Sequence, residues 1–176
     1  MNEPIAVVGA GQMGSGIAHV AALSGYPVTM IDVVGGRRWI VRRNLIYDFE
    51  KALGDTTSYA AFLKGNSRDG LFERNLVMCT RNFPGGTRLG LSFGGGGTAP
   101  QFCEDASCAT EHQNGTMRNN LIVNCSDVGI YLNKAQNTLL DHNTLYATSG
   151  IDVRFATSSA SVRNNGTACR CMFEPI

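Results

Sequence analysis

Hydrophobic and polar positions recur along most of the chain in a register that is marked by asparagine. In each copy an apolar residue is followed three positions later by asparagine and then by another apolar residue. Five asparagines fit this pattern: Asn44, Asn75, Asn120, Asn143 and Asn165. The last two intervals are about 22 residues and the first is about 30. The second, about 45, spans either two repeats or one repeat with a long insertion.

A second apolar segment recurs between the asparagines. Residues 129–132 and 150–153 carry it, and residues 59–63 and 87–93 have the same character. A period of about 22 residues with two or three short strands per turn is typical of a right-handed parallel β-helix, whose coils surround a narrow apolar core. Asparagine suits the bends, because it tolerates a left-handed φ and its amide can hydrogen-bond the asparagines of neighbouring coils.

Two other folds also contain short apolar strands. A leucine-rich repeat would show a Leu-x-x-Leu-x-Leu consensus, which the chain lacks. An antiparallel β-sandwich would not need asparagine at a fixed register. We therefore expect a mainly β chain with a parallel β-helix over residues 37–165, a long loop insertion at 83–115 and an irregular tail at 166–176.

The first 33 residues follow a different pattern. Residues 5–8 predict a buried strand, residues 15–24 have apolar positions at helical spacing, and residues 27–31 predict a second strand. The first strand leads into Gly9-Ala10-Gly11-Gln12-Met13-Gly14, and Asp32 closes the second. This is a Rossmann-like β-α-β segment, the context in which G-x-G-x-x-G binds the pyrophosphate of a dinucleotide.

Each position of this motif has a physical role. Gly9 permits the tight turn, Gly11 lets the backbone approach the pyrophosphate, and Gly14 lets the helix pack on the strand. The helix N-terminus offers free N–H groups and a partial positive charge to the phosphates. Asp32 can accept hydrogen bonds from both ribose hydroxyls, which favours NAD over NADP. The candidate NAD-binding residues are Gly9, Gly11, Gln12, Met13, Gly14 and Asp32.

This segment resembles the N-terminus of the 3-hydroxyacyl-CoA dehydrogenases over about a fifth of the chain. The matching positions are Gly9-Ala10-Gly11, Met13-Gly14, Gly16-Ile17-Ala18, Gly25, Val28 and Asp32. The resemblance implies NAD binding, but the rest of the chain has no counterpart of the family's catalytic His-aromatic-aromatic-Asn-Pro context, its glutamate or its helical C-terminal domain. We therefore expect an incomplete NAD-binding domain that joins the repeats near Val34-Gly35-Gly36.

The repeats resemble the parallel β-helix proteins related to pectate lyases, over about 130 residues and in architecture only. Such lyases neutralise a uronate carboxylate with a cation and remove the C5 proton with Lys or Arg. Lys64 and Arg154 are expected to share a register with Leu132 between them. The weak catalytic candidates are therefore Lys64, Lys134 and Arg154, and the alternative is an ordinary solvated face. Ca²⁺ could bind Glu73, Asp141 and Asp152, although no Ca²⁺ motif is visible.

Composition narrows the partners and the compartment. The 176 residues carry a net charge of +1 with 16% charged residues, which indicates neither a nucleic acid nor a membrane surface as partner. The N-terminus does not read as a signal peptide, so the chain as written is expected to be cytoplasmic, with a β-helix portion that could derive from a secreted protein.

The cysteines leave two redox states open. Cys103 and Cys108 could pair in an oxidising compartment. Alternatively all six cysteines are reduced, with Cys79 and Cys125 buried beside strands. The C-x-C pair at Cys169 and Cys171 has no second pair or nearby histidine, so no metal site is predicted.

Three functions remain open on these grounds. The first is a β-helix of carbohydrate-active type, with a polysaccharide as partner, headed by an incomplete NAD-binding segment without dehydrogenase activity. The second is a degenerate or partial NAD-binding oxidoreductase of the 3-hydroxyacyl-CoA dehydrogenase type. The third is a structural or interaction solenoid, or a recombined or engineered chain, without catalysis. A solenoid that ends in mid-coil exposes a sheet edge, so self-association through that end is also expected.

Overall fold

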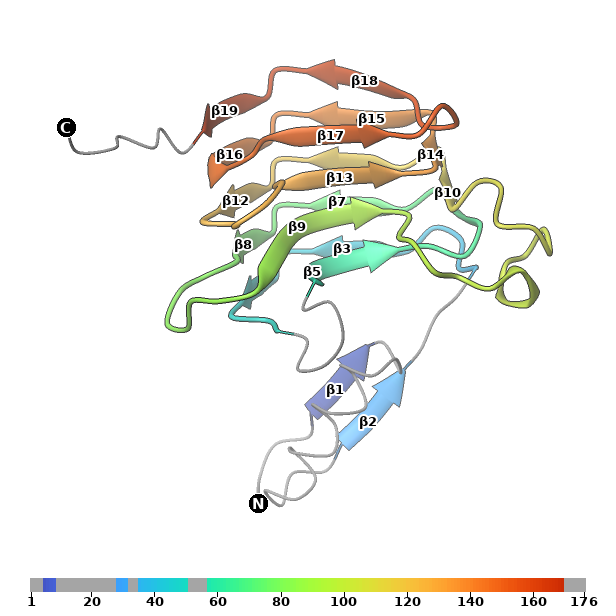
Figure 1. Ribbon diagram of the computed structural model, residues 1–176, viewed down its shortest axis with the longest axis horizontal. Helices are drawn as coiled ribbons and strands as arrows, with labels where there is room; N and C mark the ends of the chain where they lie inside the picture. Colours follow the sequence, from blue (N-terminus) through green and yellow to red (C-terminus); the bar gives the residue numbers. More distant parts are fainter. Residues whose placement is uncertain (1–4, 9–27, 32–34, 51–56, 170–176) are drawn as a thin grey trace.

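The computed structural model describes residues 5–8, 28–31, 35–50 and 57–169 of the chain. In the last two of these ranges the chain winds into coils that stack along one axis (Figure 1). Strand pairing in the described residues is parallel throughout, and each strand of the coils pairs with its equivalent one coil away. This is the parallel β-helix that the asparagine repeat predicts.

The described coils form four sheets, numbered here by the order of their first strands. Sheet 1 contains β3 (Ile40–Arg42), β7 (Leu71–Glu73), β11 (Thr116–Arg118), β15 (Thr138–Asp141) and β18 (Ala160–Arg163). Sheet 2 contains β4 (Leu45–Tyr47), β8 (Leu76–Met78), β12 (Leu121–Val123), β16 (Thr144–Thr148) and β19 (Gly166–Cys169). Sheet 3 contains β5 (Thr57–Leu63), β9 (Thr87–Phe93), β13 (Ile130–Asn133) and β17 (Ile151–Arg154). Sheet 4 contains β6 (Ser67–Arg68), β10 (His112–Gln113) and β14 (Ala135–Gln136).

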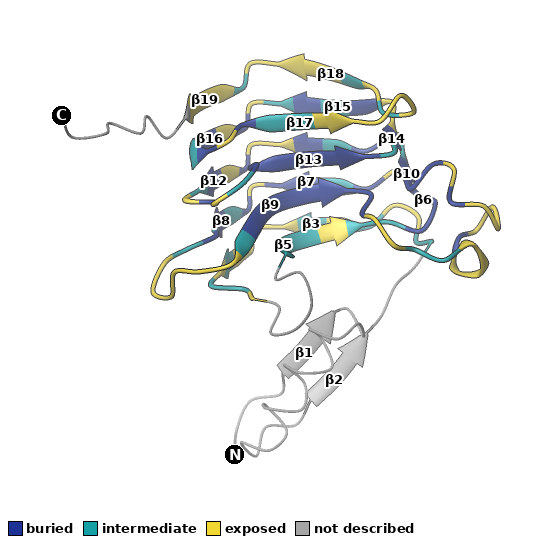
Figure 2. Cartoon of the chain, viewed as in Figure 1, coloured by how far each residue is buried: buried dark blue, intermediate teal, exposed yellow. Residues whose placement is uncertain are grey.

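Alternate residues of these strands point into one narrow core. The residues that are no more than 1% exposed come from every sheet of the middle coils and include Phe72, Val77, Leu91, Phe93, Met117, Ile122, Ile130, Leu132, Leu140 and Leu145. Each such side chain contributes about 1.5–3 kcal/mol through burial. Burial falls toward the first and last coils (Figure 2), where Val41 and Ala160 are only partly covered.

An asparagine ladder runs the length of the coils. It consists of Asn44, Asn75, Asn120, Asn143 and Asn165, and each Nδ2 donates to the Oδ1 of the next member at 2.9–3.0 Å. The same Oδ1 also accepts the preceding member's backbone N–H. The second amide proton of Asn120 reaches the carbonyl oxygen of Phe72 at 3.0 Å. Because Asn75 bonds Asn120 directly, the long interval between them is one coil with insertions.

The left-handed backbone position lies one residue before each ladder asparagine. Arg43, Arg74, Asn119, His142 and Asn164 have φ values of 57°, 54°, 55°, 53° and 51°. The expectation that the ladder asparagines themselves take the left-handed conformation is therefore wrong. The bend needs one such residue, which costs about 1 kcal/mol or more for a side chain other than glycine. The following asparagine can then aim its amide at the next coil.

Two expected boundaries differ from the structure. β9 lies inside the loop insertion expected at 83–115, because residues 87–93 pair with β5 and β13. The insertion is thus two segments, 80–86 and 94–111, on either side of β9. β19 lies inside the irregular tail expected at 166–176, where it continues sheet 2 by pairing with β16. Residues 170–176 lie outside the described residues.

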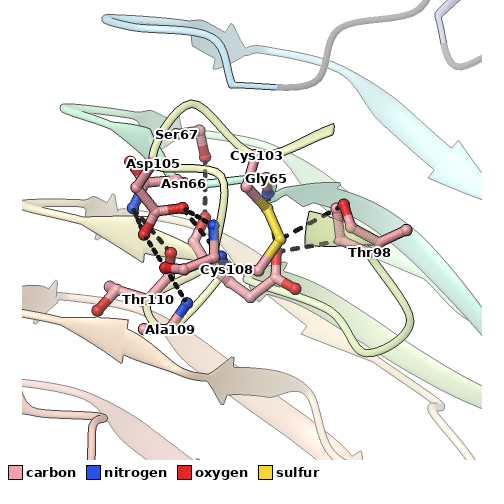
Figure 3. The surroundings of a disulfide bond; sticks show 12 residues. Gly65, Asn66, Ser67, Thr98, Cys103, Asp105, Cys108, Ala109 and Thr110 are labelled. Carbon is pink, nitrogen blue, oxygen red and sulfur yellow. Dashed lines mark hydrogen bonds between the residues drawn. A yellow bond between two sulfur atoms is a disulfide. The ribbon is translucent and has the colours of Figure 1, made fainter. Parts of the chain in front are cut away.

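Two disulfides form within the described residues. Cys79 and Cys125 join neighbouring coils across 46 residues of sequence, and Cys103 and Cys108 close a short loop (Figure 3). The alternative in which all six cysteines are reduced is therefore wrong. Cys79 and Cys125 are buried as expected, but they are bonded to each other. A crosslink of this span stabilises the folded chain by about 4 kcal/mol in the chain-entropy account.

The N-terminal segment contributes one parallel strand pair to the described residues. β1 (Ile5–Val8) pairs with β2 (Val28–Ile31), with Ile5 opposite Val28 and Val8 opposite Ile31. The helix expected at 15–24 lies outside the described residues. Among the residues that are described, no helix has the length and apolar character needed to cross a bilayer.

Replacing Asn120 tests the ladder. Asn120→Ala removes the acceptor of two Asn75 donors and the donor to Phe72 and Asn143, so buried polar groups on both neighbouring coils lose a partner. We expect a loss of about 3–5 kcal/mol in the free energy of unfolding, measured by urea denaturation. Asn165→Ala, at the less buried end of the ladder, is the matched control and should cost about 1–2 kcal/mol. Equal losses would contradict a ladder whose interior members are the strongest.

Candidate functional site

An open groove of about 260 Å³ lies on the outer face of sheet 3. Its lining combines two tyrosines, two carboxylates and one guanidinium with small polar and aliphatic side chains: Thr57, Tyr59, Thr87, Leu89, Asp127, Val128, Tyr131, Asp152 and Arg154. Tyr131, Asp152 and Arg154 come from β13 and β17, whereas Asp127 and Val128 come from the turn before β13. The groove therefore crosses all four strands of the sheet.

An irregularity in β9 turns Leu89 into this groove. In a regular strand Leu89 and Leu91 would face the same side, yet Leu89 packs with Val128 and Tyr131 outside the main core, whereas Leu91 belongs to the core. The consecutive N–H groups of Gly90 and Leu91 both donate to the next coil, at 3.0 and 2.9 Å. This is a bulge-like arrangement. A Cβ at Gly90 would lie 2.1 Å from the carbonyl oxygen of Gly129, so only glycine fits there.

The tyrosine hydroxyl of Tyr131 links the polar groups at one end of the groove. It accepts from Nδ2 of Asn133 at 3.3 Å and from Nη1 of Arg154 at 3.4 Å. The hydrogen bond that Arg154 donates to the Tyr131 hydroxyl raises the pKa of Arg154 above its ordinary value. Asp127 and Asp152 place two negative charges in the same groove. The groove thus combines hydrogen-bond donors, acceptors and tyrosine rings in its lining.

The three candidate bases do not converge. Arg154 pairs with Asn133 on the neighbouring strand, so Leu132 does not lie between Lys64 and Arg154 as expected; Leu132 pairs with Val153. Lys64 follows β5, three strand spacings of about 4.8 Å from β17, and its ammonium lies over the Phe62 ring. Arg154 lines the groove, whereas Lys64 and Lys134 do not.

The expected Ca²⁺ ligands lie on two different sheets. Glu73 forms an ion pair with Arg118 at 2.8 Å, and the carboxylate of Asp141 accepts from Nδ1 of His142 at 2.9 Å. Both carboxylates face outward on sheet 1, in a register row that alternates in charge: Arg42, Glu73, Arg118, Asp141 and Arg163. Asp152 lies in the groove on sheet 3. Among the residues that can be described, no group of three His, Cys, Asp or Glu side chains could hold a metal ion.

A buried serine–histidine pair lies where sheet 4 meets the core. Nδ1 of His112 is 2.7 Å from Oγ of Ser67, and the imidazole stacks on Phe93 with ring centroids 4.1 Å apart. Nε2 of His112 is buried without a hydrogen-bond partner. Burial lowers the pKa of His112 to about 4, which keeps the ring neutral at ordinary pH. Neither Ser67 nor His112 lines the groove on sheet 3.

The disulfide loop is anchored to sheet 4 by polar side chains (Figure 3). Glu111 is buried, and its carboxylate accepts from the backbone N–H of Gly65 at 2.8 Å and from the Thr98 hydroxyl at 3.2 Å. Nδ2 of Asn66 reaches Asp105 at 3.3 Å and the carbonyl oxygen of Thr110 at 2.9 Å. These bonds hold residues 94–111 against the coils, and the sequence pattern did not indicate them.

A fully buried arginine holds the other insertion. Arg88 donates to the carbonyl oxygens of Cys79 and Phe83 at 2.6 and 2.7 Å, and it lies 3.8 Å from Asp48. Asp48 in turn accepts the backbone N–H of Arg81 at 2.7 Å. Sequence reasoning missed this cluster, although an arginine inside the apolar run 87–93 is a visible signal for a buried charge with partners.

The candidate NAD-binding residues Gly9, Gly11, Gln12, Met13, Gly14 and Asp32 lie outside the described residues. The strands that precede them are described. β1 ends at Val8 and β2 ends at Ile31, and these two residues are register partners. The two strands therefore end at the same edge of a parallel pair, as a dinucleotide site requires. In the described residues this sheet has two strands, so the second half of a Rossmann sheet is not seen there.

Comparison with known proteins gives different matches for the two ends of the chain. Residues 4–57 match the family described as 3-hydroxyacyl-CoA dehydrogenase, NAD binding domain, and residues 103–173 match the family described as periplasmic copper-binding protein (NosD). A 3-hydroxybutyryl-CoA dehydrogenase of Bradyrhizobium diazoefficiens is 61% identical over 35 residues, which are 20% of this chain and 12% of that protein. No solved structure matches. The chain is therefore a composite of a dehydrogenase-like NAD-binding segment and a β-helix.

Acid should destabilise the chain through His112. Its pKa is about 4 in the folded chain and about 6.5 in an unfolded one, so the unfolded chain binds the extra proton between these values. We expect the free energy of unfolding to fall by up to about 3 kcal/mol as the pH is lowered from 7 to 4, measured by urea denaturation at each pH. His112→Phe, which keeps a stacked ring, should remove this pH dependence of the free energy of unfolding. An unchanged slope in that variant would contradict the assignment.

Proposed function

We propose that the β-helix binds a polysaccharide chain in the groove on sheet 3. The observation that carries this proposal is the lining of the groove, where the half-buried Tyr59 lies beside Asp127, Asp152 and Arg154. Leu89 and Tyr131 form the floor behind it and are 4% and 6% exposed. A sugar ring has an apolar C–H face and a rim of hydroxyls, so it fits a site that joins aromatic surface to fixed polar groups. The groove crosses neighbouring coils, which gives an extended chain more than one contact.

The charge of the groove favours a neutral polysaccharide over a polyuronate. Asp127 and Asp152 are opposed by a single cation, Arg154. A polymer with one carboxylate per sugar would meet this excess of negative charge, and like charges repel. The proposed ligand is therefore a neutral chain whose hydroxyls donate to the two carboxylates and accept from Arg154.

The proposed function is binding without β-elimination. An eliminating base must release its own proton first, and the Tyr131 hydrogen bond raises the pKa of Arg154. Lys64 and Lys134 lie away from the groove lining. Arg154 is therefore placed to orient a ligand hydroxyl rather than to remove a proton from carbon.

An oxidising compartment fits the β-helix. Two disulfides form within residues 79–125, and such bonds persist outside the reducing cytosol. The family that residues 103–173 match is described as periplasmic and copper-binding. The described residues do not fit a copper site, because four cysteines are in disulfides and they contain no cluster of three metal-ligating side chains.

A second proposed activity is weak nucleotide binding by the N-terminal segment. The observation that favours it is the parallel register of β1 and β2, which ends both strands at one edge, with Val8 opposite Ile31. NAD, when bound, would supply hydride-transfer chemistry. The described residues that follow in sequence instead belong to the coils, since Ile40–Arg42 pairs with β7. We therefore propose that this segment recognises the adenosine and pyrophosphate part of NAD and performs no hydride transfer.

The groove can be tested with defined oligosaccharides. Calorimetric titration with cellohexaose and xylohexaose should show binding to at least one of them, and hexagalacturonate should bind more weakly. Arg154→Ala should lower the affinity for the neutral ligand about fivefold to tenfold, because one charge-assisted hydrogen bond is lost. Arg163→Ala removes an exposed arginine from sheet 1 and should have no effect. Equal effects of the two variants, or ultraviolet absorbance from unsaturated ends of hexagalacturonate, would contradict the proposal.

The nucleotide proposal has its own test. NAD titrated into the full chain should bind weakly, and Asp32→Ala should lower the affinity about tenfold by removing the ribose contact. Asp69→Ala, at an exposed turn beside sheet 4, is the control. NAD reduction in the presence of a 3-hydroxyacyl-CoA would show that the segment is a working oxidoreductase and would refute the restriction to binding.

A further inference from the structure

The outer face of sheet 2 is apolar over its first four strands. The central residues of these strands, Ile46, Val77, Ile122 and Leu145, pack in or against the core, so the residues that flank them point outward. These eight outward positions are Leu45, Tyr47, Leu76, Met78, Leu121, Val123, Thr144 and Tyr146. We call them the apolar face. Thr144 and the two tyrosine hydroxyls are its only polar groups.

The apolar face is open to solvent in the structure. Leu45, Leu121 and Tyr146 are 52%, 41% and 60% exposed. Strand register sets the eight side chains in two rows, and the rows lie about 7 Å apart and run about 14 Å across four strands. Contiguous exposed apolar surface of this kind marks an interaction site on a folded chain. This face belongs to a different sheet from the proposed sugar groove.

Arginines border the apolar face on both sides. Arg43 and Arg74 occupy the left-handed corner on successive coils and are exposed, two residues before Leu45 and Leu76. At the opposite edge the Arg81 guanidinium lies over the Tyr47 ring, 4.8 Å from its centroid. The nearby carboxylate of Asp48 is occupied by backbone N–H groups of the insertion 80–86. The corner beside the first two strands of the face is therefore cationic, whereas the equivalent corner residues beside the next two strands are Asn119 and His142.

We propose that the apolar face docks an amphipathic helix of a partner protein whose apolar stripe is flanked by Glu or Asp. A second copy of this chain would bring the same arginines against the arginine border, whereas an acidic helix complements it. The length of the face, about 14 Å, corresponds to about three helical turns. The apolar stripe of a helix can pack across the two rows, as amphipathic helices do on apolar surfaces of their partners.

A designed peptide tests this proposal. The probe is a fluorescein-labelled helical peptide of about four turns with leucines on one face and glutamates on both flanks, and its partner peptide carries lysines instead. We expect the acidic peptide to bind in anisotropy titrations and the basic one to bind at least tenfold more weakly. Leu121→Ser and Tyr146→Ser should each lower the affinity for the acidic peptide about tenfold. Arg74→Glu should lower the affinity for the acidic peptide and raise the affinity for the basic one.

The control is Phe102→Ser, which removes an apolar side chain that is 60% exposed in the η1 turn (Pro100–Phe102). It should leave peptide binding unchanged. Equal affinity for the two peptides, or an equal effect of Phe102→Ser and Leu121→Ser, would overturn the proposal. Two further outcomes would overturn the proposed helix in favour of another partner. Dimerisation in sedimentation velocity that Leu121→Ser abolishes would indicate a second copy of this chain. Co-sedimentation with phosphatidylglycerol vesicles without peptide binding would indicate a lipid surface.

Discussion

The fold depends on one constraint: the polar groups at each buried bend must form their hydrogen bonds with the neighbouring coils. A ladder asparagine such as Asn120 donates to the coil above through Asn143 and to the coil below through Phe72, and it accepts from Asn75. A coil alone would leave these groups unsatisfied at a cost of about 1–3 kcal/mol each. The ladder therefore sets the register of sheets 1 and 2, and extra chain can leave the coil only away from it, as the segments 80–86 and 94–111 do.

The sequence predicts the elements that recur in every coil. It does not predict contacts that depend on which residues of the neighbouring coil lie opposite. Periodicity located the asparagine ladder and the equivalent strands of sheet 3, because those residues carry out the same task in every coil. The groove was harder to foresee. Counting positions placed Leu132 beside Arg154, whereas the strands pair Arg154 with Asn133, and the irregularity at Gly90 turns Leu89 outward by a local break in alternation. The Cys79–Cys125 bond depends on which coils are adjacent, and the length of the insertion hides this from the sequence.

The two parts of the chain make incompatible demands on the residues that join them. A dinucleotide site needs further strands beside β1 and β2 to complete its sheet. The match to the NAD-binding family runs to residue 57, but Ile40–Arg42 and Leu45–Tyr47 within that match pair with β7 and β8 of the β-helix. The same backbone donors and acceptors cannot serve both sheets. The described structure therefore assigns this stretch to the coils, and the recognisable motif at the N-terminus says little about the chemistry of the rest.

The alternating charges on sheet 1 impose a rule on how such a solenoid can change length. Arg42, Glu73, Arg118, Asp141 and Arg163 succeed one another from coil to coil. Excision of the coil that carries Glu73 would bring Arg42 beside Arg118, whereas excision of that coil together with the next would bring Arg42 beside Asp141. Like charges on adjacent strands are unfavourable. Gain or loss of two coils at a time would therefore keep opposite charges on adjacent strands, whereas gain or loss of a single coil would not.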